Sequence, residues 1–432
     1  MKKILSTGLL FLIMLSGMFA QDAKKLKTYL DAKQYDKAKA EVDAAIAKNP
    51  NDALALYYKS KVYAMLASEP QFKTTVPDAR EQAFVAFKKA ADNDKDNKLL
   101  LVLTQDQYKP IFDLYTGYYD AGAAAFNSGA SGNKADFDVA LIQFKNADMV
   151  GRYIYSKKWA LSEIDTQLVL TMGKAAINAG KKDEAVKYLR QLADANIAGT
   201  KDDKESYQLP YQWLSFYYKD AKDDANFLKY STLGKKLFPK EDYYDAVMLD
   251  YYRDKKDYDN LFKKYDEVVT AYPDSVQYHF NYANEAFVYV YNSDAGTKIN
   301  NKDALLKIVG TELQKVAAVK PNDINTNWLL GQYYYNQGID LKEMANAIKS
   351  TKPEDVKKKA DLNAQAKDVI NKAIPFAEKA LSTLEAGYKK TDKSKYKSIV
   401  DLMQRVYTSL NQADKVKLYT AKYDSADSKF VN

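Results

Sequence analysis

His279 is the only histidine among the 432 residues and the first candidate for chemistry. It stands in VQYHFNYANEAF, and a helical metal site would need a second ligand at helical spacing, such as the paired histidines of H-E-x-x-H. Cysteine is absent, which excludes thiolate metal sites and disulfides. Asp and Glu could bind a hard cation, but the sequence has no Asp-x-Asp-x-Asp-Gly loop. We therefore expect His279 to be a half-buried packing residue.

Paired carboxylates occur in short runs such as KDDK, KED and DDA. Acidic residues in such charged runs between helices are usually solvated turn residues or helix caps. The glycine-bearing stretch NSGASGNKADF lacks the Lys-Ser/Thr pair of a phosphate-binding loop, so we interpret it as an inter-helix connection. Catalysis needs a convergent, buried group of side chains with shifted pKa values, and the sequence indicates none. We predict a protein that is not an enzyme and uses no cofactor and no metal.

The composition indicates which elements carry these residues. Glycine and proline are scarce, at 16 and 10 residues, so few residues interrupt segments rich in Ala, Leu, Lys, Glu and Asp. This favours helices over strands. The net charge is +8, but basic and acidic residues alternate in short runs such as KKDEAVK. Without a long basic block, nucleic-acid binding is not expected.

The first 20 residues have the layout of a secretory signal. Lys2 and Lys3 precede the apolar run Leu9–Leu15, and small residues lead to Ala20, where we expect cleavage. The alternative is an uncleaved membrane anchor, although the apolar run is short for a bilayer span. No second run is comparably hydrophobic, and no cysteine could carry a lipid. A signal of this kind looks bacterial, so we expect an exported, soluble, periplasmic protein, free or held at the outer membrane through a partner.

Prolines mark a fixed period. Pro239 and Pro273 are 34 residues apart, Pro321 follows after a further 34 residues plus an insertion of 14, and Pro50 closes a similar segment. Small and bulky residues recur in register with these prolines. The matching positions are Tyr35, Ala38, Val42, Ala45; Met172, Gly173, Ala176, Ala185, Leu189; Leu214, Tyr218, Phe227; Met248, Tyr252, Tyr258, Leu261, Tyr265; and Leu330, Gly331, Tyr334.

This pattern resembles the tetratricopeptide (TPR) repeat, and the whole chain resembles exported TPR proteins of Bacteroidetes-type bacteria. The resemblance implies an all-α, right-handed superhelical solenoid of about nine helix pairs. We expect a signal peptide at 1–20, N-terminal units at 21–200 and C-terminal units at 201–432, with a long inserted helix at about 339–388. Insertions are expected near 68–78 and 292–303, and Pro375 should kink the long helix.

The stretch WLLGQYYYNQG illustrates the repeat. Gly331 is the position where the second helix of the pair approaches closely, Tyr334 is a packing residue, and Gly338 is expected to close the helix. The tryptophan of the pattern would fall at Asn327, whereas Trp328 lies one residue later. We therefore expect the indole to point towards the groove.

The resemblance also implies a concave groove lined by the first helix of each pair. Its positions carry rings, amides and one arginine in the C-terminal half, a mixture that suits a peptide or protein partner. At the same positions the N-terminal half has Lys61, Ala64 and Lys174. A C-terminal carboxylate clamp is not expected, since its Lys, Asn and Arg set is not reproduced. The candidate groove residues are Phe216, Tyr243, Asp250, Arg253, Phe280, Asn284, Phe287, Trp328, Gln332 and Tyr335.

The predicted function is a protein-interaction scaffold of the cell envelope. The alternative is a glycan-binding component of an outer-membrane uptake system, because Trp328 and Tyr335 could stack on sugars as well as on peptides.

Overall fold

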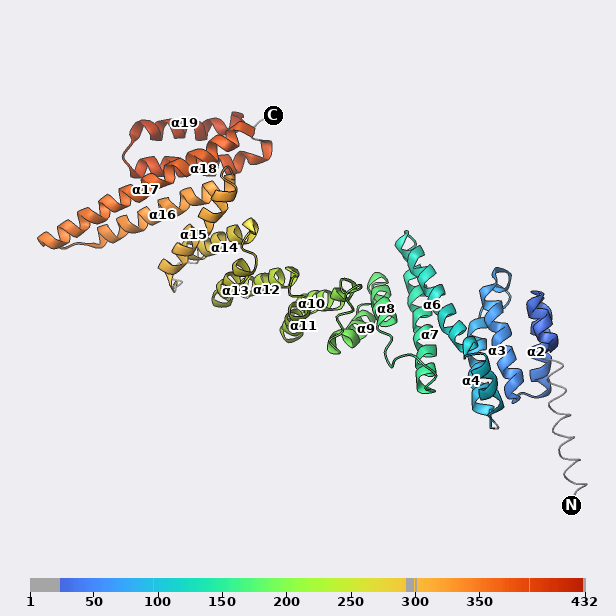
Figure 1. Ribbon diagram of the computed structural model, residues 1–432. Helices are drawn as coiled ribbons and strands as arrows, with labels where there is room; N and C mark the ends of the chain where they lie inside the picture. Colours follow the sequence, from blue (N-terminus) through green and yellow to red (C-terminus); the bar gives the residue numbers. More distant parts are fainter. Residues whose placement is uncertain (1–23, 96, 293–298, 300, 388, 430–432) are drawn as a thin grey trace, which may run out of the picture. The chain divides into compact units, whose positions relative to one another are not determined.

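The structure, a computed structural model, describes residues 24–95, 97–292, 299, 301–387 and 389–429, and these residues form helices and their connections (Figure 1). The expected signal peptide and most of the expected insertion at 292–303 lie outside the described residues. No described helix combines the length and the apolar character needed to cross a membrane. The chain divides into two compact units, the first ending at Tyr244 and the second beginning at Asp245.

The first unit consists of short and medium-length helices. Residues 24–31 are helical. They are followed by α2 (Tyr35–Lys48), α3 (Ala53–Ser68), α4 (Ala79–Asn93), α5 (Lys98–Gln105), α6 (Lys109–Ala130), α7 (Asp136–Ser156), α8 (Thr166–Asn178), α9 (Lys182–Asp194), α10 (Leu209–Asp220), α11 (Asp224–Leu237) and the start of α12 (Tyr243–Asp254).

The second unit contains the longest helices. After the remainder of α12 it comprises α13 (Tyr258–Ala271), α14 (Val276–Asn292), α15 (Lys302–Val319), α16 (Ile324–Ala347), α17 (Pro353–Gly387), α18 (Lys393–Ser409) and α19 (Ala413–Lys429). The expected long helix at 339–388 thus corresponds to the end of α16 and the whole of α17. Helix α17 continues across Pro375.

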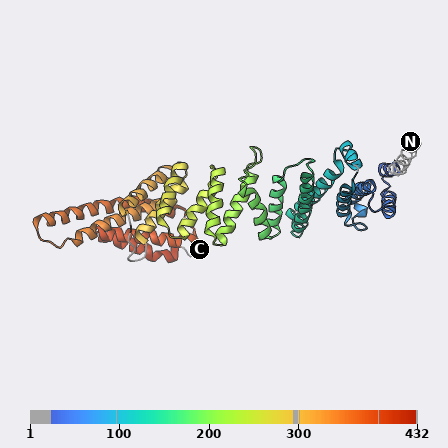
Figure 2. The ribbon, with the colours of Figure 1, turned by 90° about the horizontal axis from the view of Figure 1, so that it is seen from below.

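Successive helices lie side by side in pairs within each unit (Figure 2). Seven such pairs are α3–α4, α6–α7, α8–α9, α10–α11, α14–α15, α16–α17 and α18–α19, while α5 is an additional helix between α4 and α6. Residues 24–31 and α2 are joined by the ion pair Lys25–Glu41, and α12 and α13 share a core that includes Leu249 and Leu261, so the described residues form nine pairs. Helices bury apolar faces against their neighbours within each unit, and the second unit holds separate hydrophobic clusters around α12–α14, α14–α16 and α17–α19. The prediction of an all-α, TPR-like array of about nine helix pairs is confirmed.

Gly331 lies where the repeat pattern places it. A Cβ atom on Gly331 would stand 3.3 Å from Cβ of Ala377 in α17 and 3.1 Å from Cδ2 of Leu402 in α18. The absence of a side chain therefore lets α16 approach both helices closely. Leu330 beside it is fully buried, and Tyr334 packs on the ring of Phe376, as expected for a core position.

The prediction that Gly338 closes this helix is wrong. Helix α16 runs on to Ala347, and Gly338 is buried inside it. A Cβ atom here would lie 2.3 Å from Cγ1 of Ile370 and 3.0 Å from the carbonyl oxygen of Ala366, both in α17. Gly338 thus permits a second close approach between α16 and α17. Helix α16 ends instead at Ala347, ahead of Pro353.

Acidic residues of the connections begin several helices, as predicted. The side chain of Asp223, from the DDA run, accepts a hydrogen bond from the backbone N–H of Asn226 at the start of α11. Asp52, Asp165, Asp257 and Asp323 begin their helices in the same way. Each such cap satisfies a backbone donor that the helix leaves unpaired.

Candidate binding cleft

A solvent-open cleft of about 770 Å³ lies in the first unit. Its walls are the turn after the first helix, the C-terminal half of α3, Arg80 of α4, the turn between α5 and α6, and the first half of α6. The additional helix α5 and its turn stand between two helix pairs at this point, and Gln107 and Tyr108 of that turn adopt left-handed backbone angles. The cleft therefore occurs where the repeat register is interrupted.

A charged network forms one wall of the cleft. The hydroxyl of Tyr57, whose ring is fully buried, donates to Oδ2 of Asp106 (2.5 Å), and Nζ of Lys61 lies 3.0 Å from the same oxygen. Burial alone would raise the pKa of Asp106, but the hydrogen bonds from Tyr57 and Lys61 outweigh it and hold that pKa below its usual value. The carboxylate stays charged at neutral pH, so Lys61 is held in place rather than free to swing.

Arg80 lies on another wall. Its guanidinium carbon stands 5.2 Å from the ring centroid of Tyr118, and its Nε is close to Gly117, where an added Cβ would lie only 3.1 Å away. Burial lowers the pKa of Arg80, an effect that the nearby Tyr118 and Asp120 partly offset. The side chain is therefore fixed by α6 while it lines the cleft.

The remaining lining residues suit binding rather than catalysis. Lys109 pairs with Asp113 across one helical turn (2.6 Å), and Met65 offers a 42% exposed apolar side chain. The lining contains no histidine, and the chain contains no cysteine. The cleft presents fixed charges of both signs, an apolar contact and hydrogen-bonding groups, which together can hold an extended segment of another molecule.

Sequence reasoning placed the groove elsewhere. Lys61 and Ala64 occupy predicted groove positions of α3 and line this cleft. Because Lys61 is charged and Ala64 is small, the sequence favoured the ring-rich C-terminal half as the binding site. Arg80 belongs to the second helix of its pair, where the repeat pattern predicts no binding residue. The available signals were the insertion near 68–78 and the extra residues before α6, because both interrupt the regular stacking.

Three of the predicted groove residues lie at or near the surface of α10 and α12. Phe216 is 64% exposed. Tyr243 is half-buried, and its hydroxyl donates to the carbonyl oxygen of Gln212 (3.1 Å). Asp250 is exposed and accepts from Arg253 (2.6 Å). None of the ten lines the cleft described above.

The arginine among them is engaged within the second unit. Arg253 binds Asp250, Glu285 (2.9 Å) and the hydroxyl of Tyr265 (3.1 Å). The structure thus brings Asp250 and Arg253 together. Their role towards a partner stays a prediction.

The other predicted groove residues differ in exposure. Asn284 is exposed and Gln332 half-buried. Phe287 is only 4% exposed and belongs to the core formed by α14, α15 and α16, on which Phe280 packs. Trp328 and Tyr335 are half-buried against the core formed by α17, α18 and α19. In this conformation those four rings contact the protein's own core.

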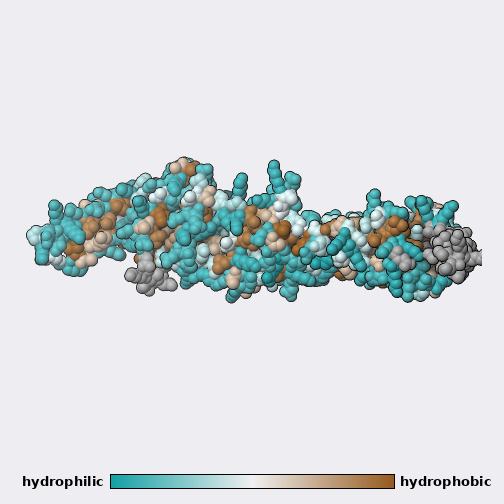
Figure 3. Space-filling model, turned by 60° about the horizontal axis from the view of Figure 1, so that its bottom comes forward, coloured by the Kyte–Doolittle hydropathy of each residue, from teal (hydrophilic) through white to brown (hydrophobic). Residues whose placement is uncertain are grey.

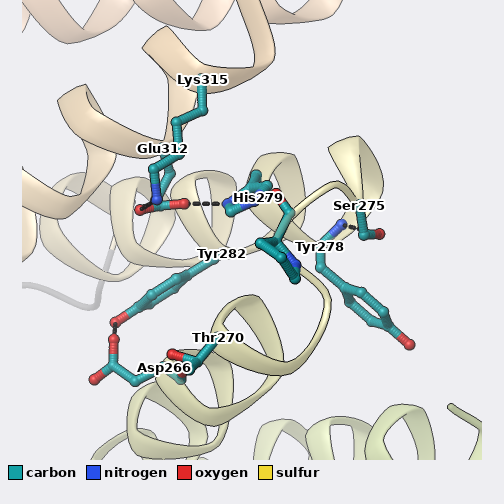
Figure 4. A network of polar contacts seen from close by, with 9 residues as sticks. Asp266, Thr270, Ser275, Tyr278, His279, Tyr282, Glu312 and Lys315 are labelled. Carbon is teal, nitrogen blue, oxygen red and sulfur yellow. Dashed lines mark hydrogen bonds and ion pairs between the residues drawn. The ribbon is translucent and has the colours of Figure 1, made fainter. Parts of the chain in front are cut away.

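His279 is more buried than we expected, with 4% exposure. Its Nδ1 contacts Oε2 of the buried Glu312, and its Nε2 donates to the carbonyl oxygen of Pro273 (2.8 Å). Oε1 of Glu312 pairs with Lys315 (2.9 Å) (Figure 4). Among the described residues, no group of three or more His, Asp or Glu side chains is placed to hold a metal ion. The histidine joins α14 to α15 through a buried polar network.

Exposed apolar side chains are spread over many helices. On the face shown in Figure 3, hydrophobic patches are separated by hydrophilic side chains. Phe216 and Val319, at 64% and 67%, are the most exposed large hydrophobic residues described. Isolated exposed residues of this kind are normal on a protein surface.

Comparison with known proteins gives no family. No family model matches the chain, and no curated protein matches it. Among solved structures, the human IFIT1 dimer with m7Gppp-AAAA is 14% identical, with 84% of this chain and 68% of that chain covered and a TM-score of 0.28. The P58(IPK) TPR domain is 14% identical (91% and 98% covered, TM-score 0.25), and the Cut9–Hcn1 hetero-tetramer of the APC/C is 13% identical (93% and 86% covered, TM-score 0.30). At these scores the likenesses carry no argument about function.

Proposed function

We propose that this protein is a non-catalytic interaction scaffold that binds a segment of a partner protein in the cleft of its first unit. The observation that carries the proposal is the cleft itself, open to solvent and about 770 Å³ in volume, in a fold of stacked helix pairs. The cleft is lined by fixed charges of both signs and by the exposed apolar side chain of Met65. Protein–protein interfaces combine charged and apolar side chains in the same way. The predicted secretory signal at 1–20 supports a place in the cell envelope.

The glycan-binding alternative rests on Trp328 and Tyr335. Both rings are half-buried against the core of α17, α18 and α19. No observation in the described residues favours this alternative over a protein partner.

Site-specific photo-crosslinking tests the cleft. A photoreactive phenylalanine analogue replaces Met65 inside the cleft, Phe216 on the predicted C-terminal groove, or Val319 as an exposed control outside both. We expect a discrete crosslinked partner from position 65 and none from position 319. A partner captured only from position 216 would move the site to α10. Equal capture from all three positions would contradict a specific cleft.

The envelope location is tested separately. The full-length chain is produced in a bacterial host, the cell fractions are separated, and the protein's N-terminus is sequenced. We expect a periplasmic protein that begins at Gln21, because cleavage is predicted after Ala20. Intact protein starting at Met1 in the cytosol would contradict the predicted export.

A further inference from the structure

Arg80 differs from every other arginine of the chain in its partners. Arg152 lies 2.7 Å from Asp148, Arg190 lies 3.3 Å from Asp194, and Arg405 lies 3.0 Å from Asp401. Arg253 has two carboxylate partners, as described above. Arg80 has no carboxylate within ion-pair distance among the described residues, although it lines the cleft.

The surroundings of Arg80 keep it in this unpaired state. Gly117 leaves room for the guanidinium against the α6 backbone, and the ring of Tyr118 lies beside it. Asp120 acts on Arg80 through space, but it forms no ion pair with it. The nearby Lys61 and Lys109 are already paired, with Asp106 and Asp113. A half-buried cation that has lost part of its water and forms no ion pair is stabilised further when an anion reaches it.

We propose that Arg80 anchors an oxyanion, a carboxylate or phosphate group, carried by the segment that enters the cleft. A guanidinium presents a planar fork of N–H donors that matches two oxygens of such a group. The guanidinium carbon lies over the ring of Tyr118, at a distance typical of a cation–π contact. This inference rests on the proposed function and adds the chemistry of the ligand to it.

Asp120 weakens the attraction of this site for anions. It is exposed on α6 and lowers the local potential that an incoming oxyanion meets. An anion therefore binds only if its contacts with the guanidinium exceed this repulsion. The matched variant Asp120→Asn keeps the size of the side chain and removes the charge, so it should strengthen anion binding.

Arginine-selective modification of the full chain with phenylglyoxal, followed by mass mapping, tests the site. The probes are inorganic phosphate and glutarate, each compared with chloride at equal ionic strength. We expect at least one of them to slow modification of Arg80 by about threefold when its concentration is about twice its Kd. Arg152, Arg190 and Arg405 are internal controls in the same sample. Protection by phosphate alone, by glutarate alone or by both identifies the source of the oxyanion.

Two variants make the result decisive. Asp120→Asn should increase protection of Arg80, and Arg80→Gln should abolish any rise in melting temperature that the protecting anion produces in the wild type. Protection of Arg80 that never exceeds that of the other arginines would overturn the inference. If photo-crosslinking from position 65 succeeds while both anions fail to protect Arg80, the scaffold proposal stands and only the oxyanion anchor is wrong.

Discussion

At the scale of single residues, the abundance of tyrosine has an internal explanation. Buried or half-buried rings pack in both units, and many of their hydroxyls donate to a carboxylate on another element or turn. A tyrosine of this kind combines a large apolar area with one polar group that must find a partner. The pairs are Tyr57–Asp106, Tyr63–Asp43, Tyr115–Asp165, Tyr230–Asp194, Tyr272–Asp245, Tyr282–Asp266, Tyr291–Asp340, Tyr396–Glu385 and Tyr407–Glu378.

These pairs should make the free energy of unfolding depend on pH. Burial alone would raise the pKa of Asp43, but hydrogen bonds from Lys39 and Tyr63 and the charge of Lys59 hold it below its usual value. A carboxylate with a depressed folded pKa stabilises the fold above its unfolded pKa of about 3.9, and this stability is lost as the pH falls through the folded value. We expect Asp43→Asn to be less stable than wild type at pH 7, with a difference that shrinks below about pH 4.

Urea unfolding from pH 7 to pH 3 measures this difference. Asp113→Asn is a suitable control, because Asp113 is exposed and, within the described part of the chain, its side chain pairs only with Lys109 along the same helix. A difference between Asp43→Asn and wild type that stays constant over the whole range would contradict the expected linkage.

The buried histidine network should be sensitive to truncation. His279→Ala removes the partner of Oε2 of Glu312 and leaves that buried carboxylate with Lys315 alone. We expect a loss of about 1–3 kcal/mol in the free energy of unfolding, because a buried carboxylate loses one of its two hydrogen-bond partners. Lys315→Ala, at the exposed end of the same network, should cost about 1 kcal/mol or less. Equal effects of the two variants in chemical denaturation would show that burial does not govern this network.

At the scale of elements, the sequence predicted the helix pairs well and the ends of helices less well. The 34-residue period and Gly331 located the pairs, since a small residue at a helix crossing has a direct packing cause. Gly338 misled the prediction because glycine both ends helices and permits close contacts, and only the position of α17 separates these roles. The cleft was missed for a similar reason: it depends on how α5 interrupts the stacking, which no local pattern describes.

Gly338 provides a direct test of the close-contact role. In an ordinary helix interior, replacing glycine by alanine stabilises by about 1 kcal/mol. At Gly338 the added Cβ would meet Ile370 and the carbonyl oxygen of Ala366, so we expect Gly338→Ala to destabilise by about 1–3 kcal/mol. Gly387→Ala, where nothing lies within 4 Å, should be neutral or stabilising. Thermal melts compare the two, and a stabilised Gly338→Ala would refute the close packing of α16 on α17.

At the scale of the whole molecule, the largest helices and the proposed binding cleft lie in different compact units. The long helices and the large core around α17 and α18 belong to the second unit, whereas the cleft and Arg80 belong to the first. In tandem-repeat folds each pair depends mainly on its neighbours, so a local defect need not reach distant pairs. The sequence predicted a continuous array with N-terminal units at 21–200 and C-terminal units at 201–432, and no feature of it pointed to a division at Tyr244.

A core truncation in the second unit should therefore leave the cleft intact. Leu402 is fully buried and touches the space that Gly331 leaves open, so Leu402→Ala creates a cavity there. We expect a loss of about 2–4 kcal/mol in the stability of the helices around it. Hydrogen exchange followed by mass spectrometry should show faster exchange in α16, α17 and α18 and unchanged exchange in α3, α4 and α6. Leu418→Ala, at a 48% exposed position, is the control and should change neither region. Equally accelerated exchange in both units would mean that they unfold as one, and the cleft could then not be treated as a site that the first unit maintains alone.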